Sequence, residues 1–220
     1  RLDKAKAEQY KKQAMEELSA QGVTFPVQAD YYILASSQTA LDSANVLKQV
    51  FSDSFGDDFI QLNIKTFIKS LRQEVVQAHL QSFVNNGWGA DYNDPKNYLG
   101  QTVIGNDNAW YSSAYSNINK VEENETNKEL LDSYRTYTEM VEKADAITKD
   151  MDARYEAFAD AEAYTLEKAH MLPCYYNVGW CLTRYNVHAE FSGSRMKNWE
   201  TKADGYTVDE VKAILAAQGK

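Results

Sequence analysis

The feature that most constrains the fold is an alternation of strand-like and helix-like segments within the first 90 residues. Residues 25–34 are rich in strand-forming residues, and residues 58–66 alternate polar and apolar side chains with the period of two that a strand requires. Between them, apolar residues at helical spacing run from Ala40 to Phe55, after a serine that can cap a helix. Parallel strands need a crossover of this kind, so the order predicts an α/β fold with a mostly parallel sheet flanked by helices.

The same patterns predict the remaining elements. We expect helices at residues 3–21, 67–81, 125–144, 151–170 and 207–218, and strands at 82–86 and 174–178. Thr207, followed three residues later by Glu210, predicts a capping box at the start of the last helix. Residues 106–117 and 192–206 are polar and turn-rich, so we expect irregular loops there.

The charge and hydropathy of the chain exclude two classes of partner. The 220 residues carry a formal net charge of −9, and an acidic surface argues against a general nucleic-acid binder, which needs a basic face. No run approaches the roughly 18 apolar residues that a membrane-spanning helix needs. The first residues form a charged helix, which does not resemble a signal peptide.

No catalytic or metal motif stands out. The histidines, His79, His170 and His188, form no pair with metal-ligand spacing, so we expect no metal and no cofactor. Gly87-Trp88-Gly89 lacks the further glycine and the Lys-Ser/Thr of a phosphate-binding loop. A glycosidase-type pair of carboxylates stays open on residue counts, but the absence of a nucleophile–base pair favours a protein that is not an enzyme.

The two cysteines, Cys174 and Cys181, lie seven residues apart, which is not a zinc-binding pattern. A tight hairpin between them would allow a disulfide. Two free, buried thiols are the favoured alternative, because cysteine is among the most frequently buried residue types.

An aromatic and acidic segment at residues 87–100 follows the predicted third strand. Ligands of open α/β sheets bind beyond the carboxyl ends of the strands, which places this segment at a candidate crevice. A carboxylate at Asp91, beside the rings of Trp88 and Tyr92, would bind an ammonium group through a charged hydrogen bond and cation–π attraction. The alternative, equally supported by the residues alone, is a plain turn at Asn93-Asp94-Pro95 with Trp88 in the core.

The run from Trp88 to Pro95 resembles the Trp-x-Ala-Asp-Tyr-x-(Asp/Glu)-Pro signature of bacterial extracellular solute-binding proteins of family five, the oligopeptide-binding components of ABC transporters. Arg154 with the following Ala161-Glu162, then Met171-Leu172-Pro173, is similar to a second motif of that family. Residues 192–207 resemble the ending of Gram-positive peptide-binding lipoproteins. The resemblance covers nearly the whole chain in the right order.

This resemblance implies a fold and a binding site. It implies that residues 1–220 form one type II periplasmic-binding-protein-like lobe of a two-lobed protein, the C-terminal one, with 183–220 returning towards the other lobe. It implies that Asp91 holds the α-ammonium group of a peptide and that Trp88 and Gly89 line side-chain pockets. Tyr92 belongs to the same candidate site. Asn85 stands where some members carry an arginine for the peptide carboxylate, so recognition of that end is in doubt.

The implied function is non-catalytic capture of extracellular peptides for an ABC importer. The partners would be a peptide and the permease subunits, with no nucleic acid, and with membrane contact only through a lipid anchor outside these residues. The expected location is the outer face of the membrane or the periplasm. Alternatives are a protein of the same fold that binds nickel, a haem-like ligand or an oligosaccharide, a docking module, and, with least support, a hydrolase.

Overall fold

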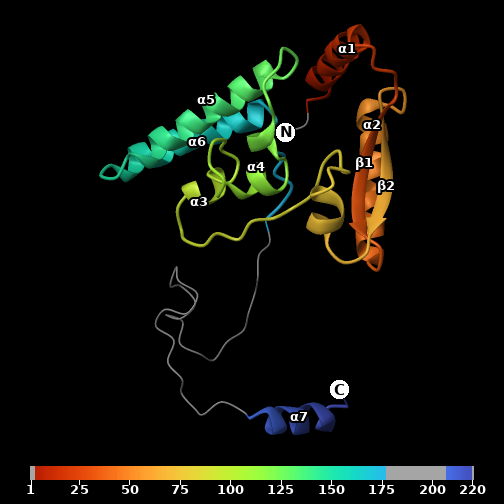
Figure 1. The fold of residues 1–220 in the computed structure, drawn as a ribbon, viewed down its shortest axis with the longest axis vertical. Helices are drawn as coiled ribbons and strands as arrows, with labels where there is room; N and C mark the ends of the chain where they lie inside the picture. The colour runs from red at the N-terminus through yellow and green to blue at the C-terminus, as the bar shows by residue number, and fades with distance from the viewer. Residues whose placement is uncertain (1–2, 177–206, 220) are drawn as a thin grey trace.

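The structure is a computed structural model that describes residues 3–176 and 207–219. A strand, β1 (Val27–Leu34), is followed by a helix, α2 (Gln38–Phe55), and a second strand, β2 (Ile60–Phe67). The strands pair in parallel, from Val27 opposite Ile60 to Leu34 opposite Phe67. This β1–α2–β2 unit lies on one side of the molecule in Figure 1 and confirms the predicted α/β class.

Local sequence signals set the ends of α2. The side chain of Ser37 accepts a hydrogen bond from the backbone N–H of Ala40, so it caps the first turn. Gly56 follows the last turn at φ +79°, a conformation that favours glycine. The helix covers one face of the sheet, where Ala29, Ile33 and Leu62 are buried.

The other face of the sheet is polar. Asn63 donates hydrogen bonds from its side-chain nitrogen to Gln28 at 3.1 Å and to Asp30 at 3.2 Å. Lys65 forms an ion pair with Asp30 at 2.5 Å. Side chains on a strand alternate between faces, so the residues between the buried ones form this polar ladder.

The predicted strand at 82–86 is wrong, although its first residue pairs with the sheet. The N–H of Ser82 donates to the carbonyl of Asp30 at 3.0 Å, and the ring of Phe83 stacks on Tyr31. The described part of the chain continues as an irregular segment, and the sheet has two strands. The two asparagines and the glycine at 85–87 have low strand propensity, which accounts for the early end of pairing.

The predicted helix at 67–81 is also wrong in extent. Only a five-residue π-helix, η1 (Arg72–Val76), forms there. The carboxylate of Glu74 accepts hydrogen bonds from the backbone N–H groups of Ile68, Lys69 and Ser70, which lowers the pKa of Glu74. These residues are therefore held as a turn after β2, and His79 at φ +55° lies just after η1.

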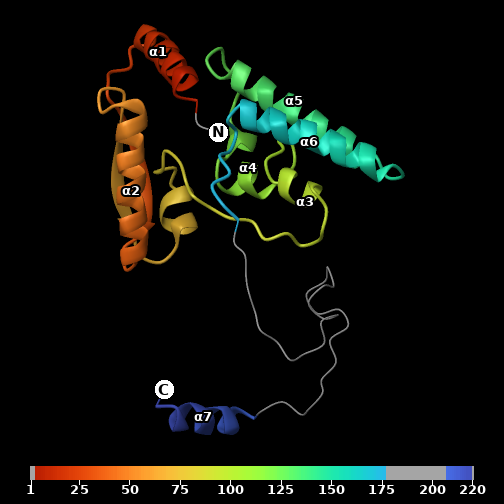
Figure 2. The ribbon, with the colours of Figure 1, turned by 180° about the vertical axis from the view of Figure 1, so that it is seen from behind.

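The second half of the described chain is helical. Its elements are α3 (Lys96–Leu99), α4 (Trp110–Ala114), the 3₁₀ turn η2 (Ile118–Lys120), α5 (Lys128–Asp145) and α6 (Met151–Glu167). Helices α5 and α6 form an antiparallel hairpin that lies against the short helices (Figure 2). The largest buried cluster lies here and includes Tyr137, Phe158 and Ala161. The two long helices confirm the predictions, whereas α4 forms inside a predicted loop.

The ends of the chain carry two further helices. α1 (Lys4–Ala20) and α7 (Val208–Ala217) match their predicted ranges, and α7 has the predicted Thr207–Glu210 capping box. Residues 174–176 have no regular structure, and Cys174 is exposed, so its predicted burial is wrong. The rest of the predicted 174–178 strand, Cys181 and the predicted loop at 192–206 lie outside the described residues. Within the described ranges, no helix has the length and apolar character that a membrane span needs.

Candidate functional site

The candidate site is the loop from Trp88 to Pro95, which joins the β1–α2–β2 side of the molecule to the helical side (Figure 1). The loop has no regular structure of its own up to Pro95, after which α3 begins. Its conformation therefore depends on side-chain contacts with the helices that follow it. Two of those contacts, made by Asn97 and Arg154, account for most of its anchoring.

Asn97 joins the two residues that the sequence singles out. Its side-chain oxygen accepts a hydrogen bond from the indole Nε1–H of Trp88 at 2.7 Å and another from the backbone N–H of Asp91 at 3.0 Å. Its side-chain nitrogen lies 3.5 Å from Oδ2 of Asp91. Asn97 itself is buried, with 4% of its surface exposed. The structure thus brings Trp88 and Asp91 together around one buried amide.

The two aspartates of the loop have different environments. Asp94 forms two hydrogen bonds with the guanidinium of Arg154, at 3.0 and 2.9 Å, and accepts a third from the backbone N–H of Lys96. Arg154 holds the pKa of Asp94 below its ordinary value. Asp91 is exposed, and it forms no ion pair with any lysine or arginine in residues 3–176 or 207–219. Its carboxylate is therefore available to an external cation.

Arg154 of α6 fastens the loop to the helical hairpin. Besides Asp94, its guanidinium donates to the carboxylate of Asp145 at 2.9 Å and to the carbonyls of Ala144, Asp145 and Ile147. The two carboxylates raise the pKa of Arg154. Burial raises the pKa of Asp145, but its ion pairs with Lys96 and Arg154 outweigh this, and the pKa is lowered. The sequence motif contains Arg154 but does not reveal this role, because its partners are distant in sequence.

The Trp88 ring supports both interpretations that the sequence leaves open. It is half-buried, and its centroid lies 6.5 Å from that of Trp110. The guanidinium of Arg72 lies over the Trp110 ring at 5.1 Å. Trp88 is therefore part of an aromatic cluster at the boundary of the two sides, and it still has surface that a ligand could contact.

The other predicted site residues form no hydrogen bond with Asn97 in the described chain. Gly89 is exposed in the loop. Asn85 is exposed; burial raises the pKa of Tyr31 of β1, and Asn85 opposes this rise only in part. Tyr92 is 48% exposed and lines a separate cavity. The structure thus groups Trp88 and Asp91 through Asn97, and it places Asn85 and Tyr92 in different surroundings.

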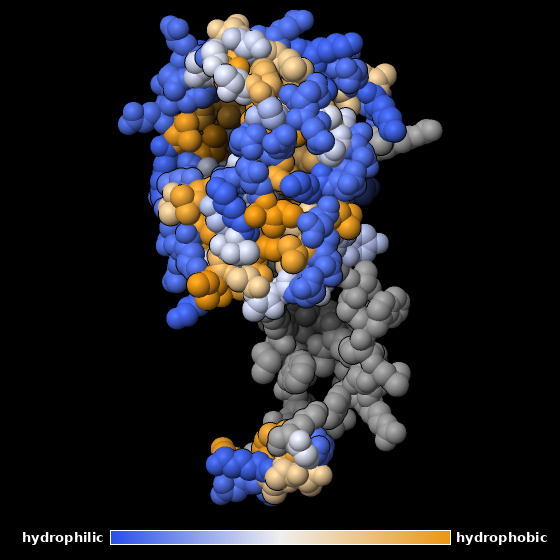
Figure 3. All heavy atoms as spheres, turned by 90° about the vertical axis from the view of Figure 1, so that its right-hand side faces the viewer, coloured by the Kyte–Doolittle hydropathy of each residue, from blue (hydrophilic) through white to orange (hydrophobic). Residues whose placement is uncertain are grey.

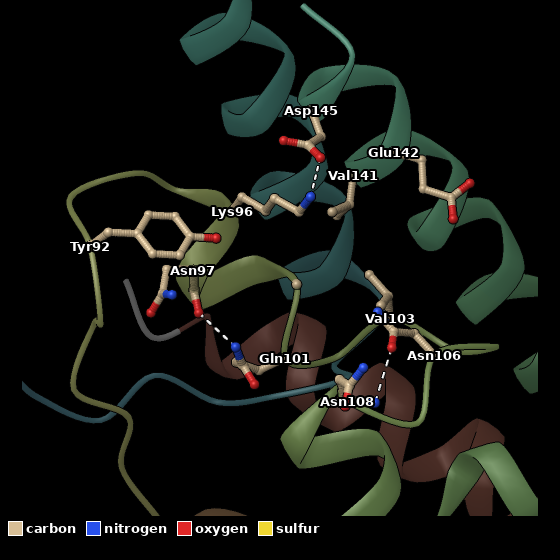
Figure 4. A pocket seen from close by; sticks show the side chains of 11 residues that line it. Tyr92, Lys96, Asn97, Gln101, Val103, Asn106, Asn108, Val141, Glu142 and Asp145 are labelled. Atoms are coloured by element: carbon tan, nitrogen blue, oxygen red, sulfur yellow. Dashed lines mark hydrogen bonds and ion pairs between the residues drawn. The ribbon is translucent and has the colours of Figure 1, made fainter.

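The cavity beside Tyr92 has a volume of about 270 Å³ and a wall of mixed polar and apolar surface (Figure 4). Tyr92 and Asn97 lie at one side of it, and Asn106 lies at the other. Lys96 points to Asp145 across its upper wall. Neither Trp88 nor Asp91 lines this cavity. Among the residues that the structure describes, no group of three or more His, Cys, Asp or Glu side chains could hold a metal ion.

Comparison with known proteins finds several oligopeptide-binding proteins. The chain is 28% identical over 168 residues to the oligopeptide-binding protein AliB of Streptococcus pneumoniae, covering 73% of this chain and 25% of the relative. It is 26% identical over 225 aligned positions to SarA of Streptococcus gordonii, covering 98% of this chain and 33% of the relative. The chain therefore spans about a quarter to a third of these relatives. No protein-family model matches the chain.

Among solved structures, the chain is similar to the unliganded open form of MppA, a periplasmic murein tripeptide binding protein. The TM-score is 0.48 at 19% identity, over 74% of this chain and 27% of MppA. The oligopeptide-binding protein AliA of Streptococcus pneumoniae is 27% identical over 178 residues, covering 78% of this chain and 26% of the relative. The chain is thus similar in sequence to bacterial oligopeptide-binding proteins, at 24–28% identity.

Proposed function

We propose that this chain forms part of a protein that captures peptides without chemical change and delivers them to an ABC importer. The names of the curated relatives, which are oligopeptide-binding proteins, support this proposal. Because the chain spans about a quarter to a third of those relatives, it would supply one type II binding-protein lobe, and the rest of the protein would supply the other. Residues 183–220 would return towards that second lobe.

The observation that carries the proposal is the carboxylate of Asp91. It is exposed, it forms no ion pair within the described residues, and its backbone N–H is held by the same amide that binds the Trp88 indole. A carboxylate of this kind binds an ammonium group by a charge-assisted hydrogen bond. The adjacent indole adds cation–π attraction. We assign Asp91 to the peptide α-ammonium group, and Trp88 with Gly89 to the neighbouring side chain.

The rest of the peptide would be bound with little sequence preference. An extended peptide presents backbone N–H and C=O groups at regular intervals, which suit recognition as an added strand. Ordered water in roomy pockets would satisfy varied side chains. Closure of two lobes around the peptide is a hinge motion, and the importer would bind the closed form.

The same proposal gives the partners and the location. Delivery to an importer requires contact with permease subunits, and capture of external peptides requires a place outside the cell membrane or in the periplasm. A lipid anchor outside these residues would keep the protein at the membrane. No residue is assigned a catalytic role.

The test is a substitution of the proposed ammonium receptor in the full-length protein that contains this chain. In the peptide complex, Asp91 and the ammonium group would form a charge pair that the bound peptide buries. Truncating one partner of such a pair typically costs ~2–5 kcal/mol, so Asp91→Asn should weaken peptide binding at least about tenfold by calorimetry. The matched control is Asp107→Asn, which neutralises another exposed loop aspartate with no ion pair in the described chain. Unchanged affinity in Asp91→Asn would remove Asp91 from the site.

A further inference from the structure

We propose that Asn97 is the positioning residue that sets the amine selectivity of the site, an inference that rests on the proposed function. Asn97 is not part of the sequence motif that ends at Pro95, and it does not bind the ligand in this proposal. It would act through Asp91 and Trp88, whose orientation it fixes.

The geometry gives Asn97 little freedom. Its backbone N–H donates to the carbonyl of Asp94 at 3.0 Å, and its own carbonyl accepts from the side chain of Gln101 at 2.9 Å. The residue is 4% exposed, so its side chain is fixed by packing as well as by these bonds. Its amide is therefore a rigid support to which the more exposed loop attaches.

The chemistry of an amide fits this position better than that of other side chains. Its oxygen takes two donors at once, the indole N–H of Trp88 and the backbone N–H of Asp91, at 2.7 and 3.0 Å. Its nitrogen faces Oδ2 of Asp91 at 3.5 Å, where a second carboxylate would repel. An apolar side chain would leave both donors without this acceptor, which is costly where water has limited access.

These contacts leave one side of the Asp91 carboxylate open. The contact with Asn97 involves Oδ2, and Oδ1 accepts no hydrogen bond from residues 3–176 or 207–219. An ammonium group approaching Oδ1 would meet a carboxylate that is already oriented. Binding would then not cost the ordering of a loop side chain, which is the general benefit of preorganisation.

The experiment measures selectivity rather than affinity alone. A pooled library of tri- to octapeptides, with each sequence present in free-amine and Nα-acetylated form, is offered to the full-length protein, and bound peptides are quantified by mass spectrometry. We expect the wild type to enrich the free-amine forms, and Asp91→Asn to lose this enrichment. Asn97→Leu, which is close in size but accepts no hydrogen bond, should reduce the enrichment about three- to tenfold. Asn97→Asp keeps the acceptor for the indole N–H but places a second carboxylate beside Oδ2 of Asp91, so it should recover only part of the enrichment.

The control separates positioning from general loss of stability. Thr165→Val removes a hydroxyl from a fully buried residue of α6, remote in sequence from the loop, and should lower stability without changing the ratio of free to acetylated peptides. If Asn97→Leu does not fold, Asn97→Ser, whose hydroxyl does not reach both donors, takes its place. An unchanged ratio in the folded Asn97 variant would overturn the role of Asn97 alone. A wild type that shows no amine preference would overturn the role of Asp91, and with it this inference.

Discussion

The β1–α2–β2 unit and the α5–α6 hairpin region are both parts of one chain, but they are stabilised differently. The helical region has two clusters of buried side chains, the larger centred on Tyr137 and Phe158. The sheet unit forms no such cluster within the described residues, and it exposes Val46 and Val50 at 65% and 50%. Figure 3 shows hydrophobic patches between polar side chains on the side of the molecule where this unit lies.

This difference indicates which region is less stabilised by contacts among the described residues. Parallel sheets are normally covered on both faces, and here the helix α2 covers one face of two strands. The matched segments cover 25% of AliB and 33% of SarA, so those relatives have further residues outside the match. The helical region already buries its own core and can hold the loop at 88–95 in place from one side.

The largest expected effect comes from breaking the ion pairs that fasten the loop to the helical region. Arg154→Met would leave Asp94 and Asp145 without the guanidinium that bonds both. Removing one partner of a buried ion pair typically costs about 3–5 kcal/mol, and the side chain of Arg154 is only 9% exposed. We expect a loss of this size in urea unfolding, together with faster hydrogen exchange in residues 88–97.

A conservative variant checks the cause of that loss. Arg154→Lys keeps a positive charge but not the planar fork that bonds Asp94 and Asp145 together. It should recover only part of the stability and leave exchange in the loop raised. Loss below about 1 kcal/mol in Arg154→Met would show that the network contributes little, as exposed pairs do.

Much of this architecture could be predicted because it depends on local signals. The caps at Ser37 and Thr207 and the helical spacing of apolar residues mark α2, α5, α6 and α7. The errors lie where a hydrogen bond between one side chain and the backbone decides the structure, which the pattern of apolar residues does not report. Residues 67–81 look helical, but the carboxylate of Glu74 binds the backbone after β2 and only η1 forms.

The candidate site shows the same division. The motif identifies Trp88 and Asp91 from residue type and spacing alone. It does not identify Asn97, because an asparagine after Asp-Pro is an ordinary residue of a turn or short helix. Its value depends on its burial and on two donors that only the folded loop brings to its oxygen.

A smaller effect should distinguish the two regions by pH. His170 stacks on Tyr134 at 3.9 Å, also faces the rings of Tyr137 and Tyr164, and has a hydroxyl at each ring nitrogen, from Ser133 and Thr165. Burial, with a further contribution from Lys168, lowers the pKa of His170 below its ordinary value of 6.5. Below pH 6.5 the unfolded chain therefore binds more protons than the folded chain, and folding stability falls as pH falls towards the lowered pKa.

Hydrogen exchange measures this pH dependence separately for each helix and strand of the intact chain. As pH falls from 7 towards the lowered pKa, the protection factors for amide exchange, which are corrected for the intrinsic rate, should fall more in α5 and α6 than in β1 and β2. His170→Gln, which has no titrating group, should flatten this dependence while the carboxylate pairs remain. A profile that keeps the same slope in His170→Gln would assign the acid sensitivity to other groups.

The smallest effect is expected for the ion pair on the polar face of the sheet. Nζ of Lys65 lies 2.5 Å from Oδ2 of Asp30, and the two side chains are 48% and 24% exposed. Water therefore solvates both charges and screens their attraction. Lys65→Met should leave the unfolding midpoint almost unchanged, in contrast to Arg154→Met. It should still raise the pKa of Asp30, which the hydrogen bond from Lys65 lowers, and NMR titration of the carboxyl carbon would detect this.

Because a lowered carboxyl pKa contributes stability above the unfolded value and loses it as pH falls, any effect of the variant should vanish in acid. A destabilisation as large as that of Arg154→Met would mean that this face is buried in the whole protein, and that the polar ladder is an interface rather than a solvated surface.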